Sequence, residues 1–92
     1  MLNAIVMINC AVDSIPEVAQ KVADLEGVQQ VYSVTGDVDL IALVRVREYD
    51  DLAVTVADSI AKVPGISTLR THLAFRAYSR SDLEEAFQLG LD

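Results

Sequence analysis

An internal repeat constrains the fold of this chain more than any other feature of its sequence. Residues 23–31, Ala-Asp-Leu-Glu-Gly-Val-Gln-Gln-Val, parallel residues 61–69, Ala-Lys-Val-Pro-Gly-Ile-Ser-Thr-Leu, 38 positions later. Both segments read as a helix end, a glycine and a strand that begins with a β-branched residue. Apolar strands predicted at residues 4–10 and 40–46 precede the two helices in the same way. The repeat therefore predicts two βαβ halves in one chain.

The spacing of apolar residues places the individual elements. Strands are predicted at residues 4–11, 28–35, 40–46 and 66–78. Helices are predicted at residues 14–27 and about 50–62, with inner faces formed by Ile15, Val18, Val22 and Leu25 and by Leu52, Val56, Ile60 and Val63. Ser14 and Glu17 fit a capping box for the first helix, which Gly27 closes. Asp50 and Asp51 fit the cap of the second helix.

The element order βαββαβ predicts an α+β, ferredoxin-like fold, in which both helices cover one face of a four-stranded antiparallel sheet. We expect this domain over residues 1–80 and a short C-terminal helix over 81–92. Strands 28–35 and 66–78 carry apolar residues in both alternating sets, so the second sheet face is expected to pack on another subunit. The chain is 52% hydrophobic, which is more than 92 residues easily bury. Both observations predict self-association.

Charge and composition exclude several classes of function. Fourteen acidic residues against seven basic ones give a net charge of −7, which disfavours direct nucleic-acid binding. No apolar run reaches the roughly 18 residues of a membrane span, and no basic leader with a cleavage pattern is evident. The single cysteine, Cys10, reads as a buried strand residue in a reducing compartment. We therefore expect a cytoplasmic protein with no membrane contact.

A polar turn, Thr-Gly-Asp-Val-Asp at residues 35–39, separates two apolar strands. Gly36 can take a positive φ, and aspartates tolerate turn geometry. One interpretation is a hairpin turn whose two carboxylates, Asp37 and Asp39, keep it soluble. The other is a small-molecule site, in which Asp39 pairs with an ammonium group and N–H groups from Gly36 to Val38 meet a carboxylate. Spacing alone leaves both interpretations open.

Nothing in the sequence predicts an enzyme, a cofactor or a metal site. It has no Cys/His metal spacing, no glycine-rich phosphate loop before a helix and no nucleophile elbow. His72 is the only histidine, and Cys10 has no evident basic partner. A small dimeric ferredoxin-like enzyme is the remaining catalytic alternative. Such enzymes place a histidine or paired acids under the sheet, where this chain offers only His72.

Three segments together resemble one known family. They are Val-Tyr-Ser-Val-Thr-Gly-Asp-Val-Asp-Leu at 31–40, Val-Pro-Gly-Ile at 63–66, and the Arg-Thr pair at 70–71 of the strand that follows. Their order and spacing resemble the effector domain of the Lrp/AsnC regulators, also called the RAM domain, over about residues 4–79. Family members usually carry an N-terminal helix-turn-helix domain, and this chain begins three residues before its first predicted strand. The resemblance therefore implies a stand-alone effector domain.

The resemblance also implies partners and a ligand site. Family domains dimerise through their sheets and assemble into rings, commonly octamers or decamers, that bind amino-acid effectors between subunits near the turn before the third strand. The implied ligand-binding residues are Gly36, Asp37, Val38, Asp39, Leu69, Thr71 and Tyr32. Thr71 matches a hydroxyl position of the last strand, although it is equally a simple strand threonine. Leu69 stands where the family often has threonine. Tyr32 lines the site or a dimer face, with core packing as the default.

Two functions from different classes follow. The first is an amino-acid-binding regulatory module that acts by ligand-linked assembly, or by co-assembly with full-length Lrp/AsnC regulators. The second is a structural oligomer or assembly adaptor with a vestigial pocket, which Leu69 favours because it makes the pocket more apolar.

Overall fold

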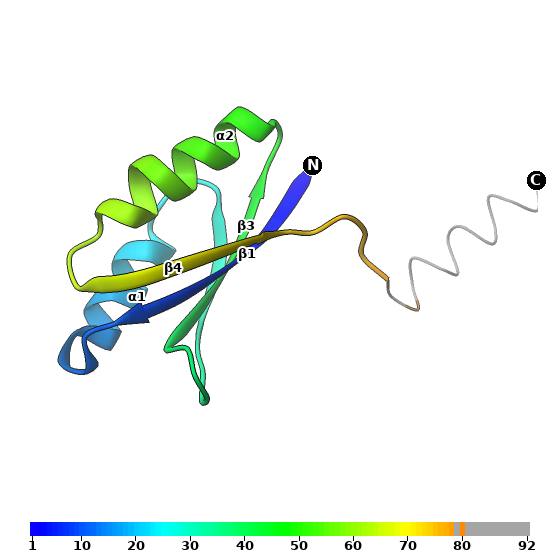
Figure 1. Cartoon of the computed structure of the whole chain (residues 1–92). Coiled ribbons are helices and arrows are strands. Elements are labelled where there is room, and N and C mark those ends of the chain that lie inside the picture. The colour runs from blue at the N-terminus through cyan, green and yellow to red at the C-terminus, as the bar shows by residue number, and fades with distance from the viewer. Residues whose placement is uncertain (79, 81–92) are drawn as a thin grey trace, which may run out of the picture.

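β1 (Leu2–Cys10) and β3 (Leu40–Val46) form the centre of a four-stranded sheet in the computed structural model, which describes residues 1–78 and 80. β2 (Val28–Ser33) and β4 (Ile66–Leu73) are the edge strands, in the order β2-β3-β1-β4, and every pairing is antiparallel. The helical segments lie on one side of the sheet (Figure 1). They are η1 (Val12–Ser14), α1 (Ile15–Ala23), α2 (Tyr49–Ala53), the π-helix η2 (Val54–Ser59) and η3 (Ile60–Lys62). The predicted ferredoxin-like α+β fold is confirmed.

Alternation along the two central strands builds the core. The side chains that face the helices are Ala4, Val6, Ile8 and Cys10 from β1 and Leu40, Ala42, Val44 and Val46 from β3, all of them buried. Val18 and Val22 of α1 cover one part of this layer, and Leu52 and Ile60 cover another. Both predicted helix stripes are thus confirmed, because their remaining members are partly buried against the same cluster.

The opposite side of the sheet, here called the open face, has no helix over it among the described residues (Figure 1). The strand register places four apolar side chains at its centre: Ile5, Met7, Ile41 and Leu43. The edge strands contribute Gln30 and the aromatic Tyr32 on β2 and the polar residues Thr68, Arg70 and His72 on β4. The expectation of apolar residues on both faces is therefore wrong for β4, whereas β2 carries Tyr32 on the open face and valines on the other. A register shift between Val28 and Gln30 turns both valines of β2, Val28 and Val31, toward the core.

Helix capping differs from the sequence prediction. Ser14 makes no side-chain cap bond, and its Oγ instead donates to Asp13 Oδ1 at 3.3 Å. The reason is the 3₁₀ turn before α1, which holds Ser14 at φ −116° and ψ 4° rather than in the extended conformation of a capping residue. The capping box lies at the second helix instead, between Glu48 and Asp51. The second helix accordingly begins at Tyr49.

Two strands and the first helix also end earlier in the chain than predicted. β2 ends at Ser33, opposite Leu40, where β3 begins. β4 ends at Leu73 rather than at residue 78, because its partner β1 begins at Leu2 and Ala4 already pairs with Leu73. α1 ends at Ala23, four residues before Gly27. The predicted C-terminal helix at 81–92 lies outside the described residues. In the described part of the chain, no helix is long and apolar enough to cross a membrane.

Candidate functional site

The turn between β2 and β3 is held by main-chain hydrogen bonds at its base. The Val34 N–H donates to the Asp39 carbonyl at 3.1 Å, and the Asp39 N–H donates to the Ile8 carbonyl of β1 at 3.0 Å. Gly36 has φ +114°, and nothing lies within 4 Å of the position that a Cβ would take there. Asp37 is exposed, whereas Val38 is buried. The turn therefore has a fixed base and an open, solvated tip.

Asp39 joins this turn to the end of β1. Its Oδ2 accepts a hydrogen bond from the Cys10 backbone N–H at 2.9 Å, and the side chain is partly buried. Burial, together with the nearby Asp39 charge, raises the pKa of the Cys10 thiol. Among the described residues, Oδ1 of Asp39 takes no hydrogen bond. One carboxylate oxygen of Asp39 thus accepts a hydrogen bond that joins the turn to β1, and the other accepts none from the described residues.

The three remaining predicted site residues lie on the edge strands. Leu69 of β4 pairs with Ile8 of β1, and the Ile8 carbonyl accepts the Asp39 N–H. Thr71 lies two residues further along β4, opposite Val6, and is exposed. Tyr32 pairs with Ile41 on the open face, where its side chain is 48% exposed and its hydroxyl donates to Gln30 Oε1 at 2.7 Å. Core packing, the default expectation for Tyr32, is therefore wrong within one chain.

One chain does not bring these residues into a single enclosure. Tyr32 and Thr71 belong to opposite edges of the sheet, and the register places them on opposite faces. His72 faces the side opposite to Thr71, as the alternation predicts. Leu69 is aligned with the base of the turn, and Tyr32 lies on β2 just before that base. Within one subunit, Leu69 and Tyr32 therefore adjoin the turn from different edge strands, and Thr71 lies further away along β4.

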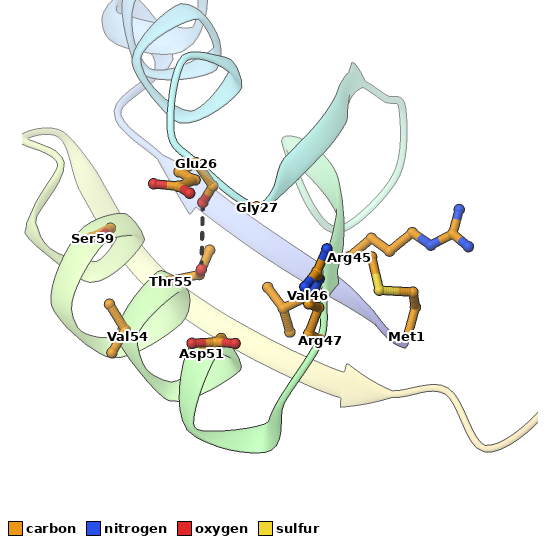
Figure 2. Close-up of a pocket in the computed structure, with 10 residues that line it drawn as sticks. All are labelled: Met1, Glu26, Gly27, Arg45, Val46, Arg47, Asp51, Val54, Thr55 and Ser59. Carbon is orange, nitrogen blue, oxygen red and sulfur yellow. Dashed lines mark hydrogen bonds between the residues drawn. The ribbon is translucent and has the colours of Figure 1, made fainter.

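A hollow that sequence reasoning missed lies at the other end of β3. It is open to solvent, has a volume of about 430 Å³ and is lined by the loop before β2, the end of β3 and the second helical segment, including Glu26, Gly27, Val46, Arg47, Asp51 and Thr55 (Figure 2). Thr55 is 6% exposed, and its hydroxyl donates to the Glu26 carbonyl at 3.4 Å. The repeat marks Gly27 in the sequence, but nothing in the spacing of residues predicts that Thr55 is buried beside it. Within the described residues, no group of three His, Cys, Asp or Glu side chains is placed to hold a metal ion.

The fold and the turn define a ferredoxin-like domain with an exposed polar loop beside its sheet. The family model of the Lrp/AsnC ligand binding domain matches residues 3–83. The chain belongs to this family, so the resemblance noted in the sequence is confirmed. The family is one of transcriptional regulators rather than of enzymes.

Individual relatives agree with this assignment. The chain is 30% identical over 78 residues to the HTH-type transcriptional regulator LysM of Saccharolobus solfataricus, covering 84% of this chain and 54% of the relative. It thus spans about half the length of the curated relatives that it matches. The crystal structure of TTHA0845 from Thermus thermophilus superposes with a TM-score of 0.82 at 39% identity, over 87% of this chain and all of that one. The regulator NMB0573 of Neisseria meningitidis, solved as a complex with L-Met, shares the fold at a TM-score of 0.76 and 16% identity, over 86% and 53% of the two chains.

Proposed function

We propose that this protein is an amino-acid-binding regulatory module whose ligand site is built around the β2–β3 turn. The observation that carries the proposal is the hydrogen bonding of the Asp39 carboxylate. The Cys10 N–H fixes one oxygen of its carboxylate, and the other oxygen takes no hydrogen bond from the described residues. A carboxylate that is already oriented loses little side-chain entropy when it binds a cation. Membership of a family of ligand-binding domains supports the same site.

A free amino acid offers charges that match this turn. Its ammonium group would meet Asp39, and its carboxylate would meet the N–H groups from Gly36 to Val38. Charge-assisted hydrogen bonds of this kind contribute about 1.5–3 kcal/mol each. The exposed tip of the turn leaves room for such a ligand, since nothing lies within 4 Å beyond Gly36. The L-Met complex of the Neisseria relative supports an amino acid as the ligand class.

Assembly completes the site in this proposal. The apolar centre of the open face, formed by Ile5, Met7, Ile41 and Leu43, is covered by a second copy of the chain. Dimers then associate into a ring of eight or ten subunits, in which Thr71 and Leu69, and Tyr32 at the opposite edge, approach the turn of a neighbouring copy. A ligand bound between subunits stabilises the assembled form by RT ln(1 + [L]/Kd), which is about 2.7 kcal/mol at a hundredfold excess over Kd.

Co-assembly connects the ligand to transcription. In this proposal the domain joins full-length Lrp/AsnC regulators through the same sheet faces. Mixing this protein with such a regulator and recording a native mass spectrum tests the step. Mixed oligomers are expected, and a spectrum that contains only separate homo-oligomers would remove co-assembly from the proposal.

The decisive experiment uses two substitutions at Asp39. A thermal-shift panel against the twenty amino acids at millimolar concentration identifies the ligand, and calorimetry then compares the wild type with Asp39→Asn and Asp39→Ala. Asparagine keeps an oxygen that can accept the Cys10 N–H, so Asp39→Asn is expected to fold normally and to bind at least about tenfold more weakly. Asp39→Ala is expected to lose both binding and stability. Wild-type affinity in Asp39→Asn would contradict the proposed role of the charge.

A structural adaptor with a vestigial pocket is the second candidate. The hydrogen bond from the Cys10 N–H to Asp39 favours this candidate, because it gives Asp39 a structural role that needs no ligand. Leu69 favours it as well, since an apolar residue aligned with the turn offers no hydrogen bond. A flat thermal-shift panel, with Asp39→Ala destabilised and Asp39→Asn unchanged, is the outcome that this alternative predicts.

A further inference from the structure

The hollow at the end of β3 is separate from the turn. The turn leads into Leu40 at the start of β3, whereas Val46 and Arg47 of the hollow lie at and beyond its other end. A strand rises about 3.3 Å per residue, so the two places are about 20 Å apart along β3. The residues Gly36, Asp39, Leu69 and Thr71 do not line the hollow. Any ligand here would occupy a site that the proposed function does not use.

One wall of the hollow is an irregular helix. Val54, Thr55 and Ser59 line it, and all three belong to the π-helical segment η2. π-helical turns are rare and occur frequently at functional sites. Thr55 is buried, yet its hydroxyl reaches only the Glu26 carbonyl at 3.4 Å, which is a long distance for an O–H donor. A ligand oxygen in the hollow could replace this weak contact with a shorter one.

The opposite wall is the loop before β2. Gly27 has φ +92°, and its carbonyl accepts the Arg45 N–H at 2.8 Å. A Cβ at this position would lie 2.9 Å from Thr55 Oγ1 and 3.2 Å from Val46 Cγ1. The absence of a side chain therefore lets the loop, the strand end and η2 approach one another around the hollow.

Charges of both signs line the space. Asp51 and Glu26 lie on either side of Thr55 in Figure 2, and Arg45 extends away from them toward Met1. Asp51 Oδ2 accepts the Glu48 N–H at 3.2 Å, which fixes this carboxylate in place. Among the described residues, no ion pair joins Arg47 to Asp51 or Glu26. The exposed side chains of Arg47, Asp51 and Glu26 thus line one hollow, and no ion pair within the described residues joins them.

From this arrangement we propose that the hollow binds a small zwitterion. The ligand carboxylate is held by the Arg47 guanidinium, its ammonium group by Asp51, and a further oxygen or hydroxyl by Thr55. The volume of about 430 Å³ lies in the lower part of the range of small-molecule pockets, about 300–1,000 Å³, and therefore suits a compact ligand. Because it uses different residues, this site stands or falls independently of the one at the turn.

Nuclear magnetic resonance separates the two sites in one experiment. The ¹⁵N-labelled full chain is titrated with a mixture of the twenty free amino acids and, in parallel, with their N-acetyl derivatives, which lack the ammonium charge. We expect the free amino acids to shift the backbone amides of Gly27, Thr55 and Ser59, and the acetylated mixture to leave them in place. Shifts at Gly36 and Asp39 report the turn site instead.

Matched variants test the assigned roles. Asp51→Asn keeps an oxygen for the Glu48 N–H, and Asp51→Asn and Arg47→Gln are each expected to weaken the response at Gly27 and Thr55 about tenfold or more. Asp50→Asn and Arg76→Gln remove the same charges outside the hollow and are expected to change nothing. The rest of each amide spectrum verifies the fold. The proposal is overturned by silent pocket amides at saturating amino acid, or by a response that Asp51→Asn and Arg47→Gln leave intact.

Discussion

Replacing Gly27 with alanine is expected to destabilise the protein by about 2–4 kcal/mol. Gly27 has φ +92°, and an ordinary residue held at positive φ costs about 1–3 kcal/mol. The added Cβ also lies 2.9 Å from Thr55 Oγ1, which is closer than real Cβ atoms come to other atoms, and 3.2 Å from Val46 Cγ1, inside the optimal 3.5–4.0 Å between carbon atoms. Overpacking of this kind costs about 1–3 kcal/mol more. The lower conformational entropy of the unfolded alanine chain offsets about 0.4–1 kcal/mol.

Gly36 provides a matched control. Its φ is +114°, but nothing lies within 4 Å of its Cβ position, so Gly36→Ala is expected to cost only the backbone part, about 1–2 kcal/mol. Urea unfolding followed by circular dichroism measures both variants at one protein concentration, because self-association would otherwise change the apparent stability. The difference between the two variants isolates the crowding around Gly27.

A double-mutant cycle completes the test. Thr55→Ala removes both atoms of Thr55 that a Cβ at position 27 would meet, Oγ1 at 2.9 Å and Cγ2 at 3.5 Å. Gly27→Ala is therefore expected to cost about 1–2 kcal/mol less in the Thr55→Ala background than in the wild type. If Gly27→Ala and Gly36→Ala cost the same, or if the Thr55→Ala background leaves the cost of Gly27→Ala unchanged, the steric argument is refuted.

Three further predictions concern the core, the thiol and the open face. Ile8→Ala is expected to cost about 2–5 kcal/mol in urea unfolding because Ile8 is 0% exposed, and a loss below about 1 kcal/mol would contradict its place in the core. Burial raises the pKa of the Cys10 thiol above its ordinary value, so the thiol loses its proton first in the unfolded chain. As the pH rises through the ordinary thiol pKa of about 8.5, the free energy of unfolding should therefore fall more in the wild type than in Cys10→Ala, and equal falls would argue against the shift. Met7→Lys places a charge at the centre of the open face and is expected to reduce the oligomer in native mass spectrometry, whereas Gln20→Lys on the exposed side of α1 should not.

The sequence predicted the architecture because the signals that define it are local. β3 was predicted with the bounds that it has, Leu40–Val46, since every residue of that run except Arg45 is apolar and turn residues precede it. The repeated glycines marked where each helical segment gives way to a strand, and the next strands begin directly after them at Val28 and Ile66. The apolar stripe on each helix, together with the βαββαβ order, then predicted that both helices pack on the same face of the sheet.

The details that failed depend on conformation rather than on composition. Ser14 and Glu17 satisfy the letter pattern of a capping box, but the 3₁₀ turn before them rotates Ser14 out of the conformation that a cap needs. Glu48 and Asp51 form the capping box that the structure contains, with Glu in place of the usual Ser or Thr at the N-cap and Asp in place of Glu or Gln at the third helical position. Nothing in the spacing of Leu52, Val56 and Ile60 distinguishes a regular helix from one that contains a π-helical segment.

The candidate sites likewise have parts that local sequence predicts and parts that only the folded chain brings together. Asp39 could be found from the sequence, because turn chemistry concentrates polar residues between two strands. Its bond to the Cys10 N–H could not, since the two residues are 29 positions apart and meet only through the register of β1 with β3. The contact of Thr55 with Glu26 has the same separation of 29, so the hollow between them appears only in the folded chain.

The two halves of the repeat differ at this hollow. Gly27 and Gly65 occupy equivalent positions, and each approaches the helical segment of the other half: Gly27 lies against Thr55, and Gly65 lies against Val18 and Ser14. At Gly65 the nearest side-chain atom is a buried valine methyl, 3.1 Å from the Cβ position, which continues the apolar core. At Gly27 the nearest is the Thr55 hydroxyl, a Val46 methyl follows at 3.2 Å, and charged residues line the adjoining hollow. The tightest contact is therefore with a methyl in one half and with a hydroxyl in the other, and this difference singles out the end of β3 as a place where ligand binding should be sought.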